Sequence, residues 1–268
     1  MSNSVAIIMR AKNEMPHVRH VFEMLKHQTF SGYDLFAIDS GSTDGTFQAL
    51  EENGGDLVQI RPGDYVPGKV LNAAIARTDH PIIVFLNADA IPHSGDWLEK
   101  LVLPVVGNMA DATFSKQVAR PDARFIVAYD YERAYTPEKI APGFFSAVAC
   151  AFRRELWDRH RFPETGYAED VAWAKACMAD GARFQLVEDS VVEHSHNYTL
   201  KELYRKRHRQ ALTFDELPSI GKQLVLCGRE VIRDLLHASS KLKFHTIPYN
   251  MAYRITIHRA IFQGLKDQ

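Results

Sequence analysis

The feature that most constrains this chain is an uninterrupted apolar run that stops at a carboxylate. Residues 82–86 read Ile-Ile-Val-Phe-Leu and are followed by Asn87, Ala88 and Asp89. Such a run is typical of a strand that is buried on both faces of a parallel sheet. Asp89 would then stand outside the carboxyl end of the strand, where open α/β sheets bind ligands. The structural alternative is that Asp89 caps a helix starting near Ser94.

Strands and helices alternate over the N-terminal third of the chain. Short apolar runs predict three strands before the one just described, at residues 5–9, 35–38 and 57–60. Helical spacing and helix-start residues predict three helices between them, after Pro16, at 46–52 and at 69–76. This alternation predicts a parallel, right-handed, doubly wound half-sheet.

Polar clusters follow three of these predicted strands, at residues 10–14, 39–46 and 87–89. The carboxyl ends of parallel strands meet at one edge of a sheet, so the clusters are expected to converge there. Neither a Gly-x-Gly-x-x-Gly motif nor a phosphate-binding loop is present in the sequence. A carboxylate can accept hydrogen bonds from a bound base or ribose. A carboxylate beside a diphosphate requires a metal cation between them, because the two anions repel.

In these clusters the chain resembles the inverting glycosyltransferases of family 2, which have the GT-A fold. The resemblance implies that Asp39 contacts the nucleotide base and that Asp89 holds a divalent cation, Mn²⁺ or Mg²⁺, on the donor diphosphate. Asn87 stands where the family usually has a first Asp, and we expect it to reach the ribose or sugar of the donor. The same resemblance assigns further cluster residues to donor binding: Arg10, Lys12, Glu14, Ser40 and Ala88.

Lys69 and Asn72 lie at the start of the helix that precedes the central strand. A phosphate at this place would also interact with the unpaired N–H groups of the helix. A solvated lysine is the ordinary explanation for Lys69. Rhamnosyltransferase-like members of the family, however, carry Gly-Lys-x-x-Asn here, and the resemblance therefore assigns both residues to donor binding. Leu71 stands where those members usually have an Arg.

The second half of the chain is expected to build the acceptor side of the cleft. We predict a helix at 97–106, a strand at 112–117, an aromatic and charged loop region at 125–142, and a strand or strand pair at 144–152.

Glu169 and Asp170 stand at the start of a predicted helix that ends at Gly181. The helix dipole favours ionised carboxylates in the first turn, and capping is the ordinary explanation for them. Inverting transfer needs one carboxylate to take the proton from the attacking hydroxyl, and the family has a Glu-Asp pair at this point. We assign Asp170 as the base. Glu169 would support it by orientation or by acceptor binding.

His194 and His196 close a predicted strand that ends within residues 191–198. Alternation along a strand would place both imidazoles on one side. An isolated His is usually a structural hydrogen-bonding residue, but two at a strand end that borders the diphosphate are candidates for metal or phosphate contact. Many GT-A enzymes take a late His as a further metal ligand. Either residue could be that ligand.

Further motifs narrow the resemblance to bacterial rhamnosyltransferases of polysaccharide synthesis. They are Arg120-Pro121-Asp122-Ala123, residues 168–175 and residues 194–198. We therefore predict transfer of L-rhamnose from dTDP-L-rhamnose to a hydroxyl of a glycan or lipid-linked oligosaccharide. Two alternatives stay open. One is a UDP-hexose donor, and the other is a non-catalytic scaffold subunit with a nucleotide-sugar fold, which Asn87 favours.

The predicted organisation is an α/β GT-A domain at 1–199 and a basic helical extension at 200–268. The formal net charge of −1 argues against a nucleic-acid binder, yet residues 201–268 carry 13 Lys and Arg against 6 Asp and Glu. Those helices either pack on the catalytic domain or contact anionic lipid. Three cysteines without paired spacing and an N-terminal apolar run too short for a signal peptide predict a cytoplasmic protein. Lipid contact would make it peripheral at the inner face of the membrane.

Overall fold

A computed structural model describes residues 5–53, 55–135, 144–164, 168–212 and 219–267. The chain divides into two compact units. The first holds residues 1–120, 131–165 and 169–194, and the second holds residues 121–130, 166–168 and 195–268.

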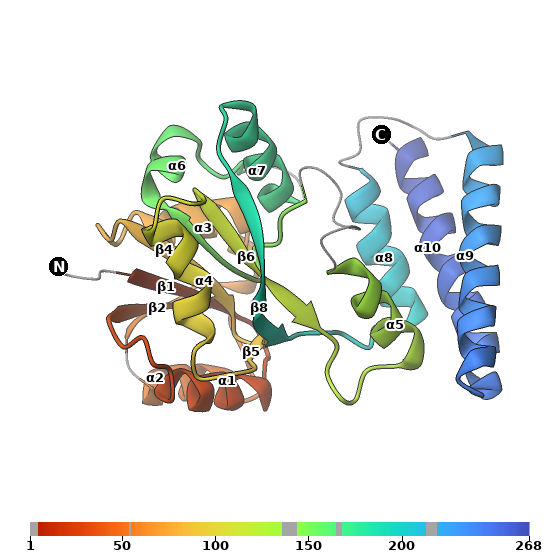
Figure 1. Ribbon diagram of the computed structural model, residues 1–268, viewed down its shortest axis with the longest axis horizontal. Coiled ribbons are helices and arrows are strands. Elements are labelled where there is room, and N and C mark those ends of the chain that lie inside the picture. The colour runs from red at the N-terminus through yellow and green to blue at the C-terminus, as the bar shows by residue number, and fades with distance from the viewer. Residues whose placement is uncertain (1–4, 54, 136–143, 165–167, 213–218, 268) are drawn as a thin grey trace. The chain divides into compact units, whose positions relative to one another are not determined.

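The first unit is built on an eight-stranded sheet in the order β3-β2-β1-β4-β7-β6-β8-β5 (Figure 1). The strands are β1 (Val5–Ala11), β2 (Tyr33–Asp39), β3 (Asp56–Gln59), β4 (Ile82–Asn87), β5 (Ile91–Pro92), β6 (Ala112–Val118), β7 (Ala149–Arg153) and β8 (Phe184–Glu193). The first four strands of the chain run parallel, with β1 between β2 and β4. The predicted parallel half-sheet is therefore confirmed.

The other half of the sheet is joined to the first by an antiparallel strand. β7 pairs antiparallel with both β4 and β6, and β6 pairs parallel with β8. As a result, β6 and β8 run in the same direction as β4. The carboxyl ends of β1, β2, β4, β6 and β8 therefore all lie at one edge of the sheet.

Helices cover both faces of this sheet (Figure 1). Those of the first unit are α1 (His17–Lys26), α2 (Thr46–Glu52), η1 (Pro62–Asp64), α3 (Pro67–Ile75), α4 (Trp97–Val106), α6 (Arg154–Arg159) and α7 (Glu169–Ala179). The predicted bounds of α2 and α4 are reproduced, and α1 buries the four apolar residues of its predicted stripe, Val18, Val21, Phe22 and Leu25. Asp96 is the N-cap residue of α4, so Asp89 does not cap that helix.

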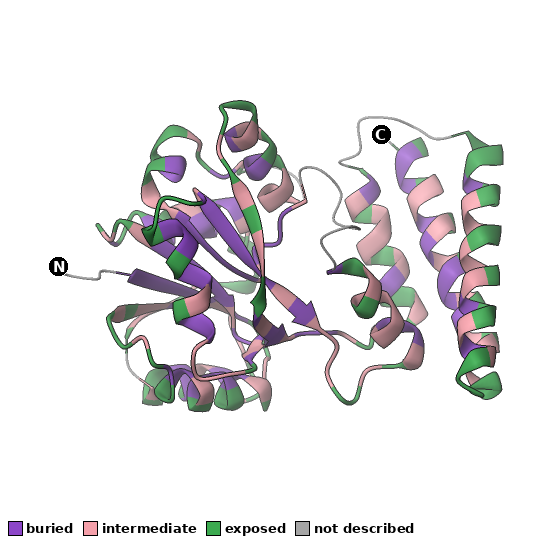
Figure 2. Ribbon diagram, in the orientation of Figure 1, coloured by how far each residue is buried: buried purple, intermediate pink, exposed green. Residues whose placement is uncertain are grey.

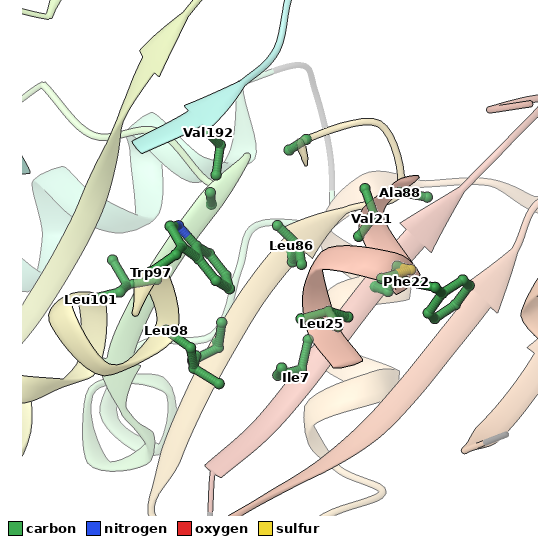
Figure 3. Packing of buried hydrophobic residues seen from close by; sticks show 14 of the residues in the cluster. Ile7, Val21, Phe22, Leu25, Leu86, Ala88, Trp97, Leu98, Leu101 and Val192 are labelled. Carbon is green, nitrogen blue, oxygen red and sulfur yellow. The ribbon is translucent and has the colours of Figure 1, made fainter. Parts of the chain in front are cut away.

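Alternating residues of the central strands feed two hydrophobic clusters on opposite faces. Ile7 and Leu86 belong to the cluster that contains α1 and α4, which Figure 3 shows around Trp97. Ile8 and Phe85 belong to the other cluster, which contains residues of α3, α6 and α7. Because both faces of β1 and β4 are covered, the strands are apolar throughout, and polar side chains occur only where they end.

Two predictions for the second half were wrong. A helix, α5 (Phe125–Ala134), occupies the first part of the predicted loop, and 136–142 lie outside the described residues. Its buried apolar residues are Ile126 and Val127, too few to form a helical repeat that the sequence could reveal. β8 ends at Glu193, so His194 and His196 follow the strand rather than alternate along it.

The second unit is helical and contains α8 (Leu200–Ala211), α9 (Ile220–Ser240), η2 (Phe244–Thr246) and α10 (Ile247–Lys266). Thr199 and Glu202 form a capping box at the start of α8. α10 packs closely on α8, because a Cβ on Gly264 would lie 2.5 Å from the carbonyl oxygen of His208. Buried Arg254 of α10 forms ion pairs with Asp234 of α9 and with Asp130. Among the described helices, none has the length and apolar content needed to span a bilayer.

Candidate active site

Three strand ends in the first unit meet at a cavity of about 330 Å³. The cavity lies where β1, β2 and β4 finish, at the edge of the sheet where ligands bind in open α/β folds. Its walls come from these ends and from the segment after β3: Arg10, Ala11, Lys12, Glu14, Ser40, Pro62, Tyr65, Asn87 and Asp89. The predicted convergence of the three polar clusters is therefore present.

Hydrogen bonds between the first two clusters fix the shape of this wall. The amide of Asn13 donates to Ser42 Oγ at 2.8 Å, and the amide of Glu14 donates to Thr46 Oγ1 at 2.8 Å. Asn13 has a φ of 56°, the left-handed conformation that Asn tolerates better than most residues. Lys12 Nζ donates to the carbonyl oxygen of Ser40 at 3.3 Å. The segment after β1 is thus tied to the segment after β2.

Asp39 ends β2 with its carboxylate fully buried. One oxygen, Oδ2, accepts hydrogen bonds from the amides of Gly41 and Ser42 at 2.9 and 3.0 Å and from Gln59 Nε2 at 3.0 Å. The other oxygen, Oδ1, has no hydrogen-bond partner among the described residues. A buried acceptor without a partner is costly. A ligand that donates an N–H or O–H to Oδ1 would remove this cost.

Asp89 lies next to the end of β4 and is 3% exposed. Arg120 Nη2 donates to Asp89 Oδ2 at 2.6 Å and to the backbone oxygen of Asp89 at 2.9 Å. His194 Nε2 lies 3.5 Å from the same Oδ2. The structure therefore brings Asp89 and His194 together, as the metal prediction requires.

A polar contact fixes the orientation of the His194 ring. Its Nδ1 lies 2.9 Å from Gln117 Oε1, and Gln117 Nε2 donates to Ser146 Oγ. Gln117 Oε1 can only accept a hydrogen bond, so this contact requires a proton on Nδ1 and orients the ring. An imidazole whose Nδ1 is held in this way, beside a carboxylate, is a common arrangement of metal ligands. The carboxylate of Asp89 suits Mn²⁺ or Mg²⁺.

Glu14 adds a second carboxylate to this side of the cavity. Burial, together with the negative charge of Asp89, raises the pKa of Glu14 to about 8, and Arg120 only partly opposes the rise. A bound cation would relieve the repulsion between Glu14 and Asp89.

Arg10 connects the cavity to α7, the helix that begins with Glu169 and Asp170. Its Nη2 donates to Asn87 Oδ1 at 3.2 Å, and its Nη1 donates to Glu169 Oε1 at 3.3 Å. Burial works against the charge of Arg10, yet Tyr65, Glu169 and Asp170 raise its pKa above the ordinary value. Burial also raises the pKa of Glu169, and Arg10 opposes that rise. The guanidinium is therefore a fixed positive charge between the cavity and the first turn of α7.

Asp170 is held at the start of α7 by backbone amides. Its Oδ1 accepts from the amide of Val171 at 2.9 Å, and its Oδ2 accepts from the amide of Ala147 at 3.4 Å. These bonds orient the carboxylate at the start of α7, where its side chain is half-buried.

Four of the residues that we assigned to the donor are absent from the wall of this cavity, and buried Asp39 is the first of them. Lys69 lines a second, largely apolar cavity of the first unit, between α3 and the strands β2 and β3. Asn72 is engaged structurally: its Oδ1 accepts from Trp157 Nε1 and from the amide of Phe162. Ala88 is fully buried, with its methyl group in the hydrophobic core.

Comparison with known proteins identifies the family. Residues 6–161, more than half of the chain, match the sequence model of Glycosyl transferase family 2. The chain belongs to this family. Among curated proteins, the O-antigen chain rhamnosyltransferase RfbN of Salmonella typhimurium is 29% identical over 203 residues, and WbaN of Salmonella anatum is 26% identical over 200 residues. The matched regions cover 70% and 69% of this chain, which spans only 65% and 64% of the length of these relatives.

Solved structures agree with the fold. The mannosyltransferase PcManGT from Pyrobaculum calidifontis, in complex with GDP-Man and Mn²⁺, has a TM-score of 0.69 at 19% identity and covers 98% of this chain and 87% of its own. Glucosyl-3-phosphoglycerate synthase from Mycobacterium tuberculosis, with Mn²⁺, uridine-diphosphate and phosphoglyceric acid, has a TM-score of 0.59 at 24% identity, with coverages of 78% and 76%. This family 2 chain thus has the GT-A fold, followed by C-terminal helices.

Two residues at the candidate site are not part of the sequence-based assignment. Arg120, which contacts Asp89, enters the sequence analysis only within a motif, and Tyr65 does not enter it. A signal for Arg120 was present, because it follows the strand predicted at 112–117. Whether that strand end reaches the same edge as β4 depends on the antiparallel insertion of β7, which the sequence does not reveal. His196 belongs to the second unit, and its predicted role as a ligand stays a prediction.

Proposed function

We propose that this family 2 glycosyl transferase moves L-rhamnose from dTDP-L-rhamnose to a hydroxyl of a glycan or lipid-linked oligosaccharide. The observation that carries the catalytic part of the proposal is the position of Arg10. It contacts Asn87 in the donor cavity and Glu169 beside the predicted base, so one side chain adjoins both halves of the reaction. The curated rhamnosyltransferases support the choice of sugar.

Donor binding would use the polar wall of the cavity. Asp39 Oδ1, which lacks a partner among the described residues, would accept the ring N–H of the base. Lys12 would supply positive charge near the diphosphate, and Asn87 would reach the ribose or sugar. A divalent cation held by Asp89 and His194 would offset the charge of the leaving diphosphate.

The transfer would be a single displacement with inversion at the anomeric carbon. The acceptor oxygen attacks that carbon while Asp170 takes the hydroxyl proton, and the bond to the diphosphate oxygen breaks with its electron pair on the nucleotide. Glu169, oriented by Arg10, would position the acceptor hydroxyl next to Asp170. No covalent enzyme intermediate is needed.

A donor screen tests the proposed sugar. The purified chain would be incubated with dTDP-L-rhamnose, UDP-glucose or GDP-mannose, with Mn²⁺, Mg²⁺ or EDTA, and nucleotide release would be measured. We expect metal-dependent release from dTDP-L-rhamnose above the other donors. A preference for UDP-glucose would contradict the proposed rhamnose donor but would still support glycosyl transfer. Calorimetry that detects no nucleotide binding, with or without metal, would favour the scaffold alternative.

The variant Asp170→Asn tests the base. Loss of a general base costs about 10²- to 10⁴-fold in kcat, and we expect this loss with donor affinity little changed. Glu155→Gln replaces an exposed residue of α6; it is the matched control and should leave kcat unchanged. Near-normal transfer by the Asp170→Asn enzyme would refute the assignment.

A further inference from the structure

Helix α9 has an apolar outer side. Six large aliphatic residues of this one helix are solvent-exposed, and two of them, Leu224 and Val225, are 68% and 70% exposed. Helical spacing places them together on one side. They are Ile220, Leu224, Val225, Ile232, Leu235 and Leu236. Figure 2 shows exposed residues along most of the length of α9.

The acidic residues of α9 face the interior of the second unit, whereas its exposed charged residues are basic. Asp234 is 2% exposed and pairs with Arg233 and Arg254, and Glu230 accepts from His258 Nε2 at 3.2 Å. Both acidic residues of the helix are therefore turned inward. All of α9 is described, and its exposed charged residues are Lys222 and Arg229, both basic. The outer side thus combines aliphatic residues with positive charge.

The turn after α9 continues this pattern. Lys241, Leu242, Lys243 and Phe244 are all exposed, with Leu242 at 76% and Phe244 at 56%. We call the six aliphatic residues of α9, Lys222, Arg229 and these four turn residues the lipid face. Single exposed leucines are common on protein surfaces, but apolar side chains that adjoin one another indicate an interaction site.

We propose that the lipid face lies in the plane of an anionic phospholipid surface. An amphipathic helix with aliphatic residues beside lysine and arginine binds at the boundary of headgroups and acyl chains. The basic residues of the face are complementary to anionic headgroups. No described helix is suited to cross a bilayer, which agrees with a helix that rests on the membrane.

The charges disfavour a second copy of this chain as the occupant. In a two-fold dimer through this side, the same patch meets itself. Lys222, Arg229, Lys241 and Lys243 would then face the same cations of the other copy, without acidic residues on the lipid face to balance them. The inference is independent of the proposed donor and acceptor, since it concerns only the second unit.

Vesicle sedimentation with the full chain tests the proposal. We would compare vesicles of neutral phosphatidylcholine with vesicles that also contain phosphatidylglycerol. The wild-type chain should bind the anionic vesicles and only weakly the neutral ones. The double variant Leu224→Gln/Leu236→Gln should weaken that binding by at least about tenfold, because it removes two aliphatic side chains from the contact. Equal binding by this variant would overturn the proposal.

Two controls distinguish lipid binding by α9 from non-specific binding through other exposed apolar residues and from self-association. Leu103→Gln/Val106→Gln replaces two exposed apolar residues of α4, in the first unit, and should bind vesicles as the wild type does. Circular dichroism and donor hydrolysis should be unchanged in both double variants, so failure of the donor chemistry would be recognised separately. The lipid proposal would be overturned if the wild-type chain bound no vesicles and formed a dimer that the α9 double variant converts to a monomer. That result would show that a second copy of the chain covers the lipid face.

Discussion

Arg10 contacts both the cavity residue Asn87 and Glu169 at the start of α7. Because position 87 is Asn, the neutral amide of Asn87 meets the guanidinium and leaves its charge for Glu169. An Asp at position 87 would compete with Glu169 for that charge. With Asn at position 87, Glu169 is therefore the carboxylate that Arg10 stabilises.

Replacing Arg10 should alter how the rate depends on pH. Burial raises the pKa of Glu169 and Arg10 opposes this, so Arg10→Met should let the pKa rise further. The ionised form of Glu169 would then be lost at a higher pH. The acid limb of the kcat profile should move upward in pH, and kcat at neutral pH should fall about tenfold or more.

Arg10→Lys is the control for this experiment. It keeps the positive charge but loses the two-pronged geometry, so the acid limb should stay near its wild-type position even where kcat falls. If Arg10→Met leaves the pH dependence of kcat unchanged, Arg10 does not act by stabilising the ionised form of Glu169.

The residue-level predictions differ in how well the structure places them. The cavity holds Asn87 and Asp89, whereas Lys69 lines another cavity and the amide of Asn72 is bonded to Trp157 and Phe162. Strand ends are fixed by the sheet, so a polar residue directly after a buried strand can be placed from sequence. The direction of a helical side chain depends on partners that are distant in the sequence, such as Trp157 for Asn72.

At the scale of elements, close packing of α8 and α10 depends on Gly264. A Cβ there would lie 2.8 Å from the Cβ of Ala211 and 2.5 Å from the carbonyl oxygen of His208. Gly264→Ala should force the helices apart and reduce the free energy of unfolding by about 1–3 kcal/mol. Thermal unfolding followed by circular dichroism would measure this.

A second glycine gives the opposite expectation. Gly228 lies within α9, and a Cβ added to it would meet no described atom within 4 Å. Gly228→Ala should therefore stabilise the protein by about 0.5–1 kcal/mol, because alanine favours the helix. Equal melting temperatures for the two variants would show that a Cβ at position 264 does not destabilise the packing of α8 and α10.

The elements themselves were largely predictable where periodicity was strong. The helix predicted at 46–52 and the buried strand at 82–86 agree with α2 and β4. Local patterns cannot report pairing between distant strands, so the sequence did not place antiparallel β7 between β4 and β6. α5 was missed because few of its residues are buried.

At the scale of the whole molecule, the two units are stabilised in different ways. The first has aliphatic and aromatic clusters on both faces of a sheet. The second also relies on a charge network in which Arg254 pairs with Asp130, Asp234 and Glu230. The hydrogen bond with His258, together with the nearby arginines, lowers the pKa of Glu230 to about 2.

This network predicts a pH-dependent stability of the second unit. The pKa of Glu230 is lower in the folded state than in the unfolded chain, where it is about 4.3 for Glu. The ionised carboxylate therefore stabilises the fold at pH values above about 4.3, and this contribution is lost as the pH falls toward about 2. Glu230→Gln should unfold more easily at pH 7, by about 1–3 kcal/mol, and the difference from the wild type should disappear at low pH. Denaturant titrations at several pH values would measure this.

Exposed Glu188 of β8 supplies the control, since Glu188→Gln should change stability little at any pH. A difference for Glu230→Gln that persists at the lowest pH would show that packing, rather than charge, is responsible.

The pairing of β4 with β7 has a consequence for access to the cavity. Residues 82–86 of β4 are matched in register with residues 149–153 of β7, so backbone hydrogen bonds join the parallel half of the sheet to the half that contains β6 and β8. Among the described strands of the first unit, no hinge separates these two halves, and the sheet beneath the cavity is continuous. We therefore expect any change in the opening of the cavity to occur in the connections that border it rather than in the sheet.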